Sequence, residues 1–319
     1  MLIDHLKLTG HGMLASCLGA LFLVVSCQGT VGPAPVQSPM VEWTPAGPYV
    51  MQGPTRLTTG DHLLAARAEQ PGLLIENQHG VELDLSGASL RGATLGTDLD
   101  KLTGIGILVR NCSDVTIKNG SLGGWKTCIS VENSSGVVLE DLSFDGWYGM
   151  RLLSSVAAEE EADWLWPHEN DDGQWQENYG AAISRTAAPD ATIRRCRGRH
   201  GQNGILMSRV DRAKVYDCDF SFLSGWGLAL WRANHNTITR NLFDYCVRGY
   251  SHGVYWRGQD SAGILIFESC SNNVVAFNSA THGGDGVFLY AGHDLTLGRA
   301  RDRGETAVGC DNNVFWGND

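Results

Sequence analysis

Residues suited to acid–base chemistry gather in one irregular stretch of this chain, residues 246–262, which contains His252, Tyr255, Arg257 and Asp260. His252 or Tyr255 can act as a general base that removes a proton next to a carboxylate. Arg257 can neutralise that carboxylate while the proton leaves. These residue types therefore suit elimination or epimerisation at an acidic sugar, with Tyr255 also able to contact the sugar.

Carboxyl groups in the same region offer a second kind of chemistry. Hydrolysis of a glycosidic bond commonly uses two carboxyl groups, one as the acid and one as the base or nucleophile. Asp260 and Asp285 form one candidate pair, Glu268 is a further carboxyl, and His282 lies close by in the sequence. Ca²⁺ at Asp260 or Asp285 is conceivable, but no run of carboxylates has the spacing of a calcium-binding loop.

Two of these candidates also have a structural interpretation, because they recur at equivalent places in a repeated pattern. Asp285 precedes a glycine as Asn203 does, which suits a turn cap, and His282 has a counterpart in His200. His252 and Arg257 have no such counterparts. They are therefore the stronger functional candidates.

The pattern that surrounds these residues is a phrase of a small residue, alternating apolar residues, a polar turn and Val/Ile-x-x-Asn/Asp/Cys. Its copies begin at Gly106, Cys128, Gly204, Gly227, Gly263 and Gly286, with weaker copies from Val81 and Gly149. Alternation with a period of two residues indicates strands and excludes helical repeats.

The period of the phrase selects the type of β-repeat. The closing positions 119 and 141, 196 and 218, and 218 and 241 lie 22, 22 and 23 residues apart. Three strands of ~3–5 residues with three short turns need about that length. Propeller blades need ~40–45 residues, and leucine-rich repeats need Leu at set positions with a helical segment. The sequence therefore predicts an all-β, right-handed parallel β-helix of about eight coils.

Strand alternation also predicts which side chains face outward. The second and fourth residues after the first residue of each phrase point away from the core. In three successive coils this places Trp231, Phe267 and Tyr290 in one external strip. Two interpretations remain open: the strip is a platform on which a sugar stacks, or it is roofed by the two irregular stretches, residues 156–179 and 246–262.

Asparagines and cysteines recur at fixed places in the later coils. Equivalent residues of neighbouring coils lie ~4.8 Å apart, so their side-chain amides can bond to one another along the stack. The expected ladders are Asn236, Asn273 and Asn313, and Asn241, Asn278 and Asn318. Cys196 with Cys218, and Cys270 with Cys310, are equivalent in the same way; they are either disulfide-bonded or small buried fillers.

The N-terminal residues predict export. An apolar run from Met13 to Val25 is too short to span a bilayer and suits a signal peptide, expected over residues 1–26. The run ends Val-Val-Ser-Cys, which resembles a bacterial lipobox with Cys27 as the lipidated residue and a membrane as partner. We expect a Pro-rich tether over residues 27–45 and the β-helix over 46–319, located in the cell envelope or secreted.

Composition and the C-terminus add further expectations. The chain is 43% hydrophobic and 18% charged, with 40 glycines in 319 residues, which suits a globular fold rich in turns. A net charge of −11 and no Lys/Arg-rich run argue against nucleic acid as a partner. The sequence stops within a coil, so we expect further coils and a cap beyond it.

From about Val81 to its end, the repeat phrase resembles the right-handed β-helix superfamily. That group includes pectate-lyase-like lyases, polygalacturonase-like hydrolases, uronan epimerases and periplasmic β-helix proteins of copper-enzyme maturation. The phrase Asn-Asn-Val-x-x-x-Asn is close to the last type. The Asn-x-Asp and Asp-Asp arrangement of polygalacturonases and the Asp-Pro-His motif of alginate epimerases are missing. The resemblance implies either a protein that acts on polysaccharide or a non-catalytic binding scaffold.

Overall fold

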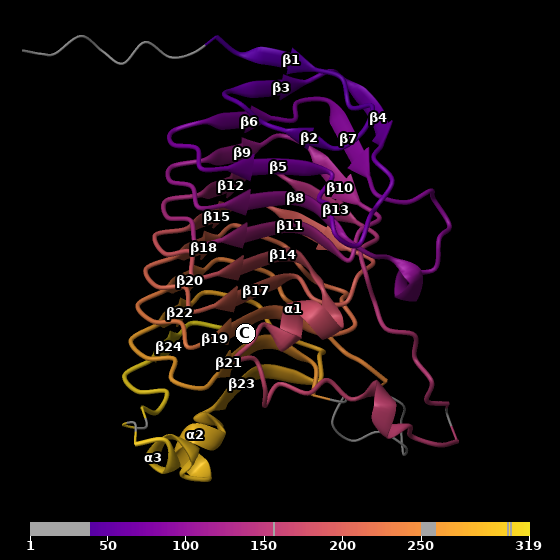
Figure 1. Cartoon of the computed structure of the whole chain (residues 1–319). Helices are drawn as coiled ribbons and strands as arrows, with labels where there is room; N and C mark the ends of the chain where they lie inside the picture. Colours follow the sequence, from indigo (N-terminus) through magenta and orange to yellow (C-terminus); the bar gives the residue numbers. More distant parts are fainter. Residues whose placement is uncertain (1–38, 156, 250–259, 305, 307) are drawn as a thin grey trace, which may run out of the picture. The chain divides into compact units, whose positions relative to one another are not determined.

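The computed structural model describes residues 39–155, 157–249, 260–304, 306 and 308–319. Residues Ser38–Asp319 form one compact unit. Within the described ranges, the chain winds through three sheets, and strands from successive coils pair in parallel (Figure 1). The predicted right-handed parallel β-helix is confirmed.

The three sheets form the sides of the coil. Sheet A has ten strands: β1 (Val41–Trp43), β3 (Thr55–Leu57), β6 (Glu82–Asp84), β9 (Thr116–Lys118), β12 (Val138–Glu140), β15 (Thr192–Arg194), β18 (Lys214–Tyr216), β20 (Thr237–Thr239), β22 (Val274–Ala276) and β24 (Val314–Trp316). Sheet B has nine: β2 (Tyr49–Val50), β5 (Leu73–Glu76), β8 (Ile105–Arg110), β11 (Thr127–Glu132), β14 (Ala181–Thr186), β17 (Ile205–Ser208), β19 (Trp226–Trp231), β21 (Ala262–Phe267) and β23 (Asp285–Tyr290). Sheet C has five: β4 (Gly60–Leu63), β7 (Ala88–Arg91), β10 (Ser121–Gly123), β13 (Ser143–Asp145) and β16 (Arg197–Arg199).

The stack extends beyond the repeats that the phrase reveals. Strand β1 pairs with β3 although residues 41–43 fall in the stretch expected to be a tether. The first coils lack the glycine and apolar alternation of the phrase, so the sequence pattern did not mark them.

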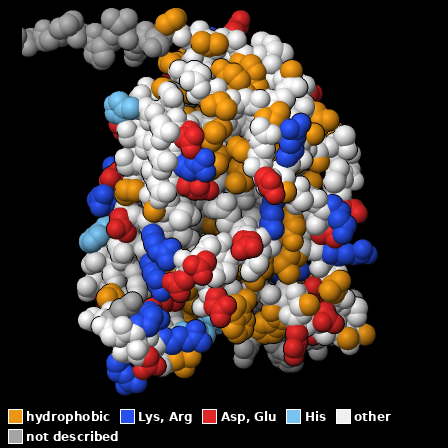
Figure 2. Space-filling model, viewed as in Figure 1, with side chains coloured by type: hydrophobic (Ala, Val, Ile, Leu, Met, Phe, Trp, Pro, Cys, Tyr) orange, Lys and Arg blue, Asp and Glu red, His pale blue; other side chains and the backbone are white. Residues whose placement is uncertain are grey.

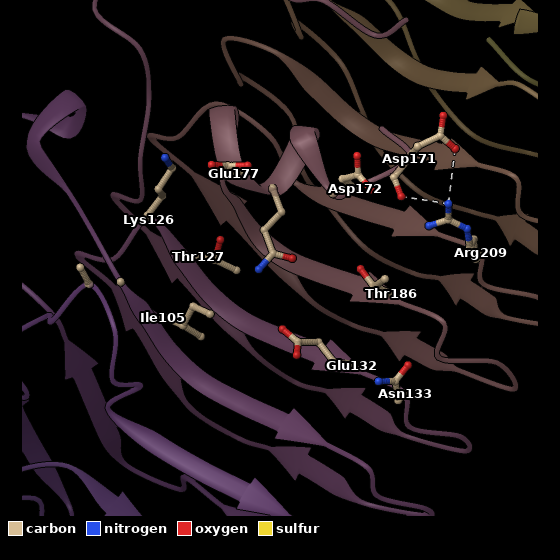
Figure 3. Close-up of a pocket in the computed structure, with 14 residues that line it drawn as sticks. Ile105, Lys126, Thr127, Glu132, Asn133, Asp171, Asp172, Glu177, Thr186 and Arg209 are labelled. Atoms are coloured by element: carbon tan, nitrogen blue, oxygen red, sulfur yellow. Dashed lines mark hydrogen bonds and ion pairs between the residues drawn. The ribbon is translucent and has the colours of Figure 1, made fainter. Parts of the chain in front are cut away.

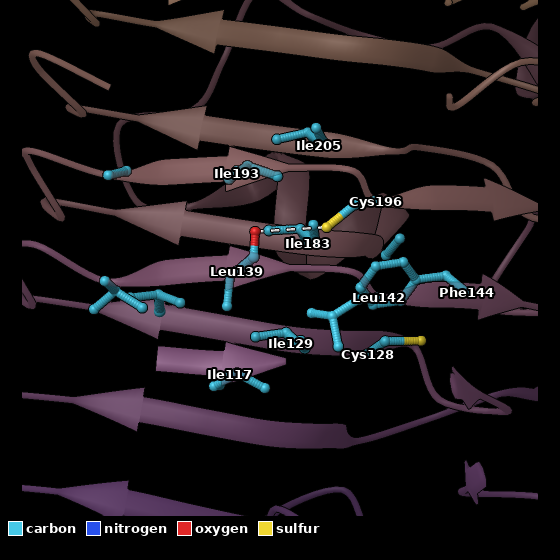
Figure 4. Close-up of a cluster of buried hydrophobic side chains, with 14 of the residues drawn as sticks. Ile117, Cys128, Ile129, Leu139, Leu142, Phe144, Ile183, Ile193, Cys196 and Ile205 are labelled. Atoms are coloured by element: carbon cyan, nitrogen blue, oxygen red, sulfur yellow. Dashed lines mark hydrogen bonds between the residues drawn. The ribbon is translucent and has the colours of Figure 1, made fainter. Parts of the chain in front are cut away.

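Inward-facing aliphatic residues form the core of the coil. Ile107, Ile129, Ile183 and Ile205 are in register on neighbouring strands of sheet B and are fully buried. Figure 4 shows isoleucines and leucines of this core between the strands. The alternation predicted from the phrase therefore matches the structure.

Both asparagine ladders are present. The Nδ2 of Asn236 donates to Oδ1 of Asn273 at 3.0 Å, and the Nδ2 of Asn241 donates to Oδ1 of Asn278 at 2.9 Å. The same bond continues from Asn278 to Asn318 at 3.0 Å. Asn241 and Asn278 also donate to the carbonyls of the buried Val215 and Ile238, so the ladder amides satisfy backbone groups as well as one another.

The paired cysteines follow the interpretation as buried fillers. Cys196, Cys218 and Cys270 are free and buried, and Cys310 is free and half-buried. Burial raises the pKa of the Cys196 thiol well above its usual value, and the neighbouring Cys218 acts in the same direction.

Two of the excursions that leave the coil between described strands contain helices. The first excursion, residues 146–180, separates β13 from β14 and contains η2 (Glu161–Asp163) and α1 (Gln174–Tyr179). The second lies between β23 and β24 and contains α2 (Gly292–Thr296) and α3 (Arg299–Asp302), which the sequence did not predict. A short 3₁₀ turn, η1 (Leu99–Lys101), precedes β8. No helix among the described residues is long and apolar enough to cross a membrane.

Candidate functional site

The outer face of sheet B changes character along the stack. At one register position the outward residues are Arg110, Glu132 and Thr186 in β8, β11 and β14. Further along, the same position carries Trp231 and Phe267 in β19 and β21. One half of this face is therefore polar and the other half aromatic.

The first excursion covers the aromatic half. Trp175 of α1 packs against Trp226 and Trp231, with ring centroids 4.8 and 5.5 Å apart. Trp231 is only 1% exposed and Phe267 is fully buried. The roofing interpretation is confirmed for these two residues, because α1 occupies the space in which a sugar would have to stack. Tyr290, at the edge of the strip, is half-buried.

A buried ion pair anchors this roof to the coil. Nη2 of Arg248 lies 3.3 Å from Oδ1 of Asp163, and both side chains are at most 2% exposed. The Asp163 carboxylate also accepts the backbone N–H groups of Leu153 at 2.9 Å and Ser154 at 2.6 Å. Burial acts to raise the pKa of Asp163, but the hydrogen bonds from Ser154 and Leu153 outweigh it and lower that pKa. The excursion is consequently held in one position.

Beside this roof, on the polar half of sheet B, lies a groove of about 520 Å³, which we call the α1 groove. Figure 3 shows its floor on the strands of sheet B and one wall on the first excursion. In the space-filling view, acidic and basic side chains surround this part of the molecule (Figure 2). Its lining residues are Ala68, Gly104, Ile105, Lys126, Thr127, Glu132, Asn133, Asp171, Asp172, Gly173, Gln176, Glu177, Thr186 and Arg209.

Hydrogen bonds fix the wall of the groove against its floor. The amide of Gln176 accepts from Oγ of Ser184 at 2.6 Å and donates to Oγ of Ser130 at 3.3 Å. Ser130 also donates to Glu132 at 3.2 Å. Ser130 and Ser184 are neighbours in register on β11 and β14. The side chain of Gln176 therefore bonds to two adjacent strands of sheet B.

Charged groups stand at both ends of the groove. Burial lowers the pKa of Lys126, and the nearby charge of Glu177 opposes that shift. At the other end, Nη2 of Arg209 donates to the carbonyl of Asp171 at 3.0 Å and lies 3.5 Å from its carboxylate. Hydroxyl, amide and charged groups thus line the space together, as needed to bind a strongly hydrogen-bonding ligand.

A second cluster of charges links the first excursion to α2. Arg232 contacts three carboxylates, at 2.6 Å to Asp171, 2.8 Å to Glu268 and 3.0 Å to Asp294. Burial raises the pKa of Glu268 to about 7, and its hydrogen bond with Asp294 adds to the shift. Burial acts to raise the pKa of Asp294 as well, but the hydrogen bonds with Glu268 and Arg303 lower it. Glu268 therefore takes up a proton close to neutral pH, whereas Asp294 stays ionised.

Two histidines lie beside this cluster, His168 in the first excursion and His293 in α2. The rings of His168 and His293 stack with centroids 4.5 Å apart and planes 12° apart. Burial lowers the pKa of both rings, and for His168 the charge of His293 lowers it further. Both imidazoles are therefore held neutral in this environment.

The catalytic candidates from the sequence are only partly brought together. Asp285 begins β23, and its N–H donates to the carbonyl of Ser261 at 3.0 Å, so Asp260 and Asp285 lie on adjacent coils. Glu268 follows the other end of β21 and is separated from them by the length of the strand. The candidates His252, Tyr255 and Arg257 lie outside the described residues.

His282 belongs to an exposed aromatic ladder rather than to the α1 groove. Its ring stacks on Tyr245 at 4.7 Å, and Tyr245 stacks on Phe222 at 4.8 Å. All three have positive φ near 55–60°, as does His200 one coil earlier, so a shared turn geometry explains the His200–His282 correspondence. Because the rings inside the ladder cover one another's faces, a stacking sugar would have only the outer faces of the end rings.

Sequence reasoning missed the residues of the α1 groove. The rule that the second and fourth residues of each repeat point outward was used only for the late coils, where these residues are aromatic. Counted from Cys128, the same rule gives Ser130 and Glu132 as outward residues, so the sequence does contain a signal for the floor of the groove. The wall could not, because the position of α1 does not follow from the repeat. No group of three or more His, Cys, Asp or Glu side chains in the described ranges is placed to hold a metal ion.

Comparisons with known proteins agree with the geometry. A family model described as the right-handed β-helix region matches residues 174–315. The surface protein and adhesin PfbA of Streptococcus pneumoniae has a similar structure, with a TM-score of 0.53 and 12% identity over 78% of this chain and 70% of that chain. A lacto-N-biosidase from Eubacterium ramulus has a TM-score of 0.46 and 13% identity, over 74% of this chain and 49% of that chain.

The A-module of a mannuronan C-5 epimerase, AlgE6 from Azotobacter vinelandii, has a TM-score of 0.42 and 11% identity, over 88% of this chain and 82% of that chain. No curated protein sequence matches the chain significantly. At such low identity the likeness concerns the fold alone. The parallel sheets, the 22–23-residue repeat and the family model over residues 174–315 together show the fold of a right-handed parallel β-helix.

Proposed function

We propose that this protein binds a polysaccharide in the α1 groove. The observation that carries the proposal is the preformed groove on the outer face of sheet B, with its wall pinned to the floor through Gln176. A rigid site lined by hydroxyl, amide and carboxylate groups suits the many hydroxyls of a glycan. The similar adhesin is named as a surface protein, which is compatible with a binding role at the cell surface.

Charge favours a glycan without acidic groups. The groove is lined by four carboxylates, Glu132, Asp171, Asp172 and Glu177, and by only two basic side chains. The whole chain carries a net charge of −11. A polyuronate would be repelled both by the carboxylates of the groove and by the net negative charge of the protein, whereas a neutral glycan would not.

The test is a binding screen of the mature protein against immobilised neutral and uronate polysaccharides. We expect neutral glycans to bind, and Glu132→Ala to weaken binding at least about fivefold, the order of a lost hydrogen bond to a charged group. Glu42→Ala is the matched control, because this exposed glutamate lies on sheet A. Binding by no glycan, or equal binding by wild type and Glu132→Ala, would reject the groove as the site.

A catalytic role is the second candidate, and the Glu268–Asp294 pair favours it. A carboxyl whose pKa is raised to about 7, beside an ionised carboxylate, has the properties of a general acid and its partner. The side chain of Glu268 is 3% exposed beneath α2, so turnover would require α2 to move. The same screen, scored for new reducing ends and unsaturated products in wild type and Glu268→Gln, decides the matter. Turnover that persists in Glu268→Gln would exclude this pair.

We also propose that Cys27 attaches the protein to a membrane of the cell envelope. The motif Val-Val-Ser-Cys after an apolar run supports this, and Cys27 lies outside the described residues. Metabolic labelling with a palmitate analogue in a bacterial host should mark the wild type and leave Cys27→Ser unmarked. Equal labelling of both proteins would argue against lipidation.

A further inference from the structure

Two tryptophans of the first excursion form a surface that the α1 groove does not use. The segment around Leu165 is irregular and its side chains alternate in direction. Leu165 is fully buried in the cluster with Trp175 and Trp231, while Trp166 is 53% exposed and Trp164 is half-buried. Burial of the central leucine thus turns the two flanking indoles outward.

Glutamates stand beside the two indoles. Trp164, Trp166, Glu159 and Glu161 line a cleft of about 510 Å³. The Nε1 of Trp164 donates to Oε1 of Glu159 at 2.8 Å, which fixes the orientation of that indole. The exposed carboxylate of Glu161 adds a second negative charge at the cleft.

The backbone that carries this cleft is held in place from below. Glu161 begins η2, which ends at the buried Asp163 of the ion pair with Arg248. The N–H of Trp166 donates to the hydroxyl of Tyr179 at 2.8 Å, and the Trp166 ring contacts His168 at 4.6 Å between centroids. The indoles are therefore presented in a fixed geometry, which reduces the entropy lost on binding.

We propose that this cleft binds an organic ammonium group, such as that of an amino sugar or of a quaternary ammonium head group. Indole faces attract cations through the ring quadrupole, and the effect is largest for tryptophan. Carboxylates add an attraction that a neutral ligand does not feel. The pairing of two indoles with two glutamates selects for positive charge, and this site is separate from the α1 groove and independent of its ligand.

The test compares charged ligands with neutral isosteres by isothermal calorimetry on the purified mature protein. One arm pairs choline with 3,3-dimethylbutanol, and the other pairs glucosamine with glucose and N-acetylglucosamine. We expect at least one ammonium ligand to bind about fivefold or more tightly than its neutral partner, the order of an exposed cation–π contact. Preference for choline or for glucosamine then identifies the source of the ammonium group.

Variants locate the binding to the cleft. Trp166→Ala and Glu161→Gln should each weaken binding at least about threefold, and Glu161→Gln preserves the shape of the side chain. Trp316→Ala is the matched control, because Trp316 is 65% exposed and lies in sheet A. Equal binding of charged and neutral ligands, unchanged binding by both cleft variants, or no binding of any ammonium ligand would each overturn the proposal.

Discussion

The rings of Trp231 and Phe267 stack with centroids 5.8 Å apart and planes 8° apart, on strands that pair in register. This is the continuous outward strip expected from the repeat, but α1 closes over it. Trp175 packs against Trp231, and His168 contacts the edge of Phe267 at 5.2 Å between centroids. The strip therefore works as a second, smaller core between the coil and the first excursion.

Trp231→Ala should reduce the free energy of unfolding by roughly 3–5 kcal/mol, because it leaves a cavity beneath the roof. Chemical denaturation followed by circular dichroism measures the change. Trp166→Ala is the control, since this indole is 53% exposed and its loss should cost about 0.5 kcal/mol or less. If the two variants lose the same stability, the strip does not act as a core.

Arg185→Met should stabilise the protein. Arg185 occupies an inward position between Val131 and Met207 and is fully buried. Burial alone lowers its pKa to about 9, and it donates only long bonds of 3.5 and 3.4 Å to backbone carbonyls. Replacing such a group by an apolar chain of similar length should gain on the order of 1–4 kcal/mol.

The exposed Arg212 provides the control for this change. It pairs with Asp190 at 2.7 Å on the surface, where ion pairs contribute little, so Arg212→Met should leave the stability nearly unchanged. A thermal melt in which Arg185→Met unfolds earlier than wild type would show that the carbonyl contacts outweigh the cost of the buried charge.

The stability that Glu268 contributes should fall as the pH rises from about 6.5 to 8. The raised pKa of Glu268 means that the folded state binds this proton more tightly than the unfolded state, so the gain is complete in acid and lost as the pH rises through about 7. The lowered pKa values of His168 and His293 act with the opposite sign, and because unfolded imidazoles are half protonated at pH 6.5, their effect extends into the same pH range. The Glu268 effect is therefore the difference between the wild type and a variant in which residue 268 does not titrate.

The loss between these pH values should be on the order of 1 kcal/mol, measured by denaturant titration at several pH values. Glu268→Gln keeps an acceptor for Arg232 and a donor for Asp294 but does not titrate. Its stability should therefore rise with pH relative to that of the wild type over the same range. A slope in the variant equal to that of the wild type would assign the effect to another group.

Asn278→Ala should cost about 1–3 kcal/mol. Its Oδ1 accepts both the N–H and the side-chain amide of Asn241, at 3.0 and 2.9 Å, and its Nδ2 donates to the carbonyl of Ile238 at 2.9 Å. Truncation leaves these buried groups without partners. Denaturation of this variant and of Thr237→Ala, on the half-buried outer side of β20, compares the ladder with an ordinary strand position. If Asn278→Ala and Thr237→Ala lose the same stability, the hydrogen bonds of the ladder add nothing beyond ordinary strand packing.

Much of the fold could be predicted from spacing because a solenoid is built one coil at a time. Three features depend only on neighbouring coils. They are the 22–23-residue period, the alternation that buries Ile205 and Met207 in the core and turns Leu206 outward, and the Asn241–Asn278 ladder. The second excursion escaped prediction because α2 and α3 are only five and four residues long, too short to show a helical period.

What the sequence determined by itself was the direction of each side chain relative to the coil, since alternation is a local property of strands. Whether an outward residue meets solvent was decided only by the tertiary structure. Trp231 and Glu132 have the same outward parity, yet Trp231 is buried beneath the first excursion and Glu132 lines an open groove. The difference arises because the Asp163–Arg248 ion pair, between residues 85 positions apart, sets where the excursion folds back. No repeat period records a contact of that kind.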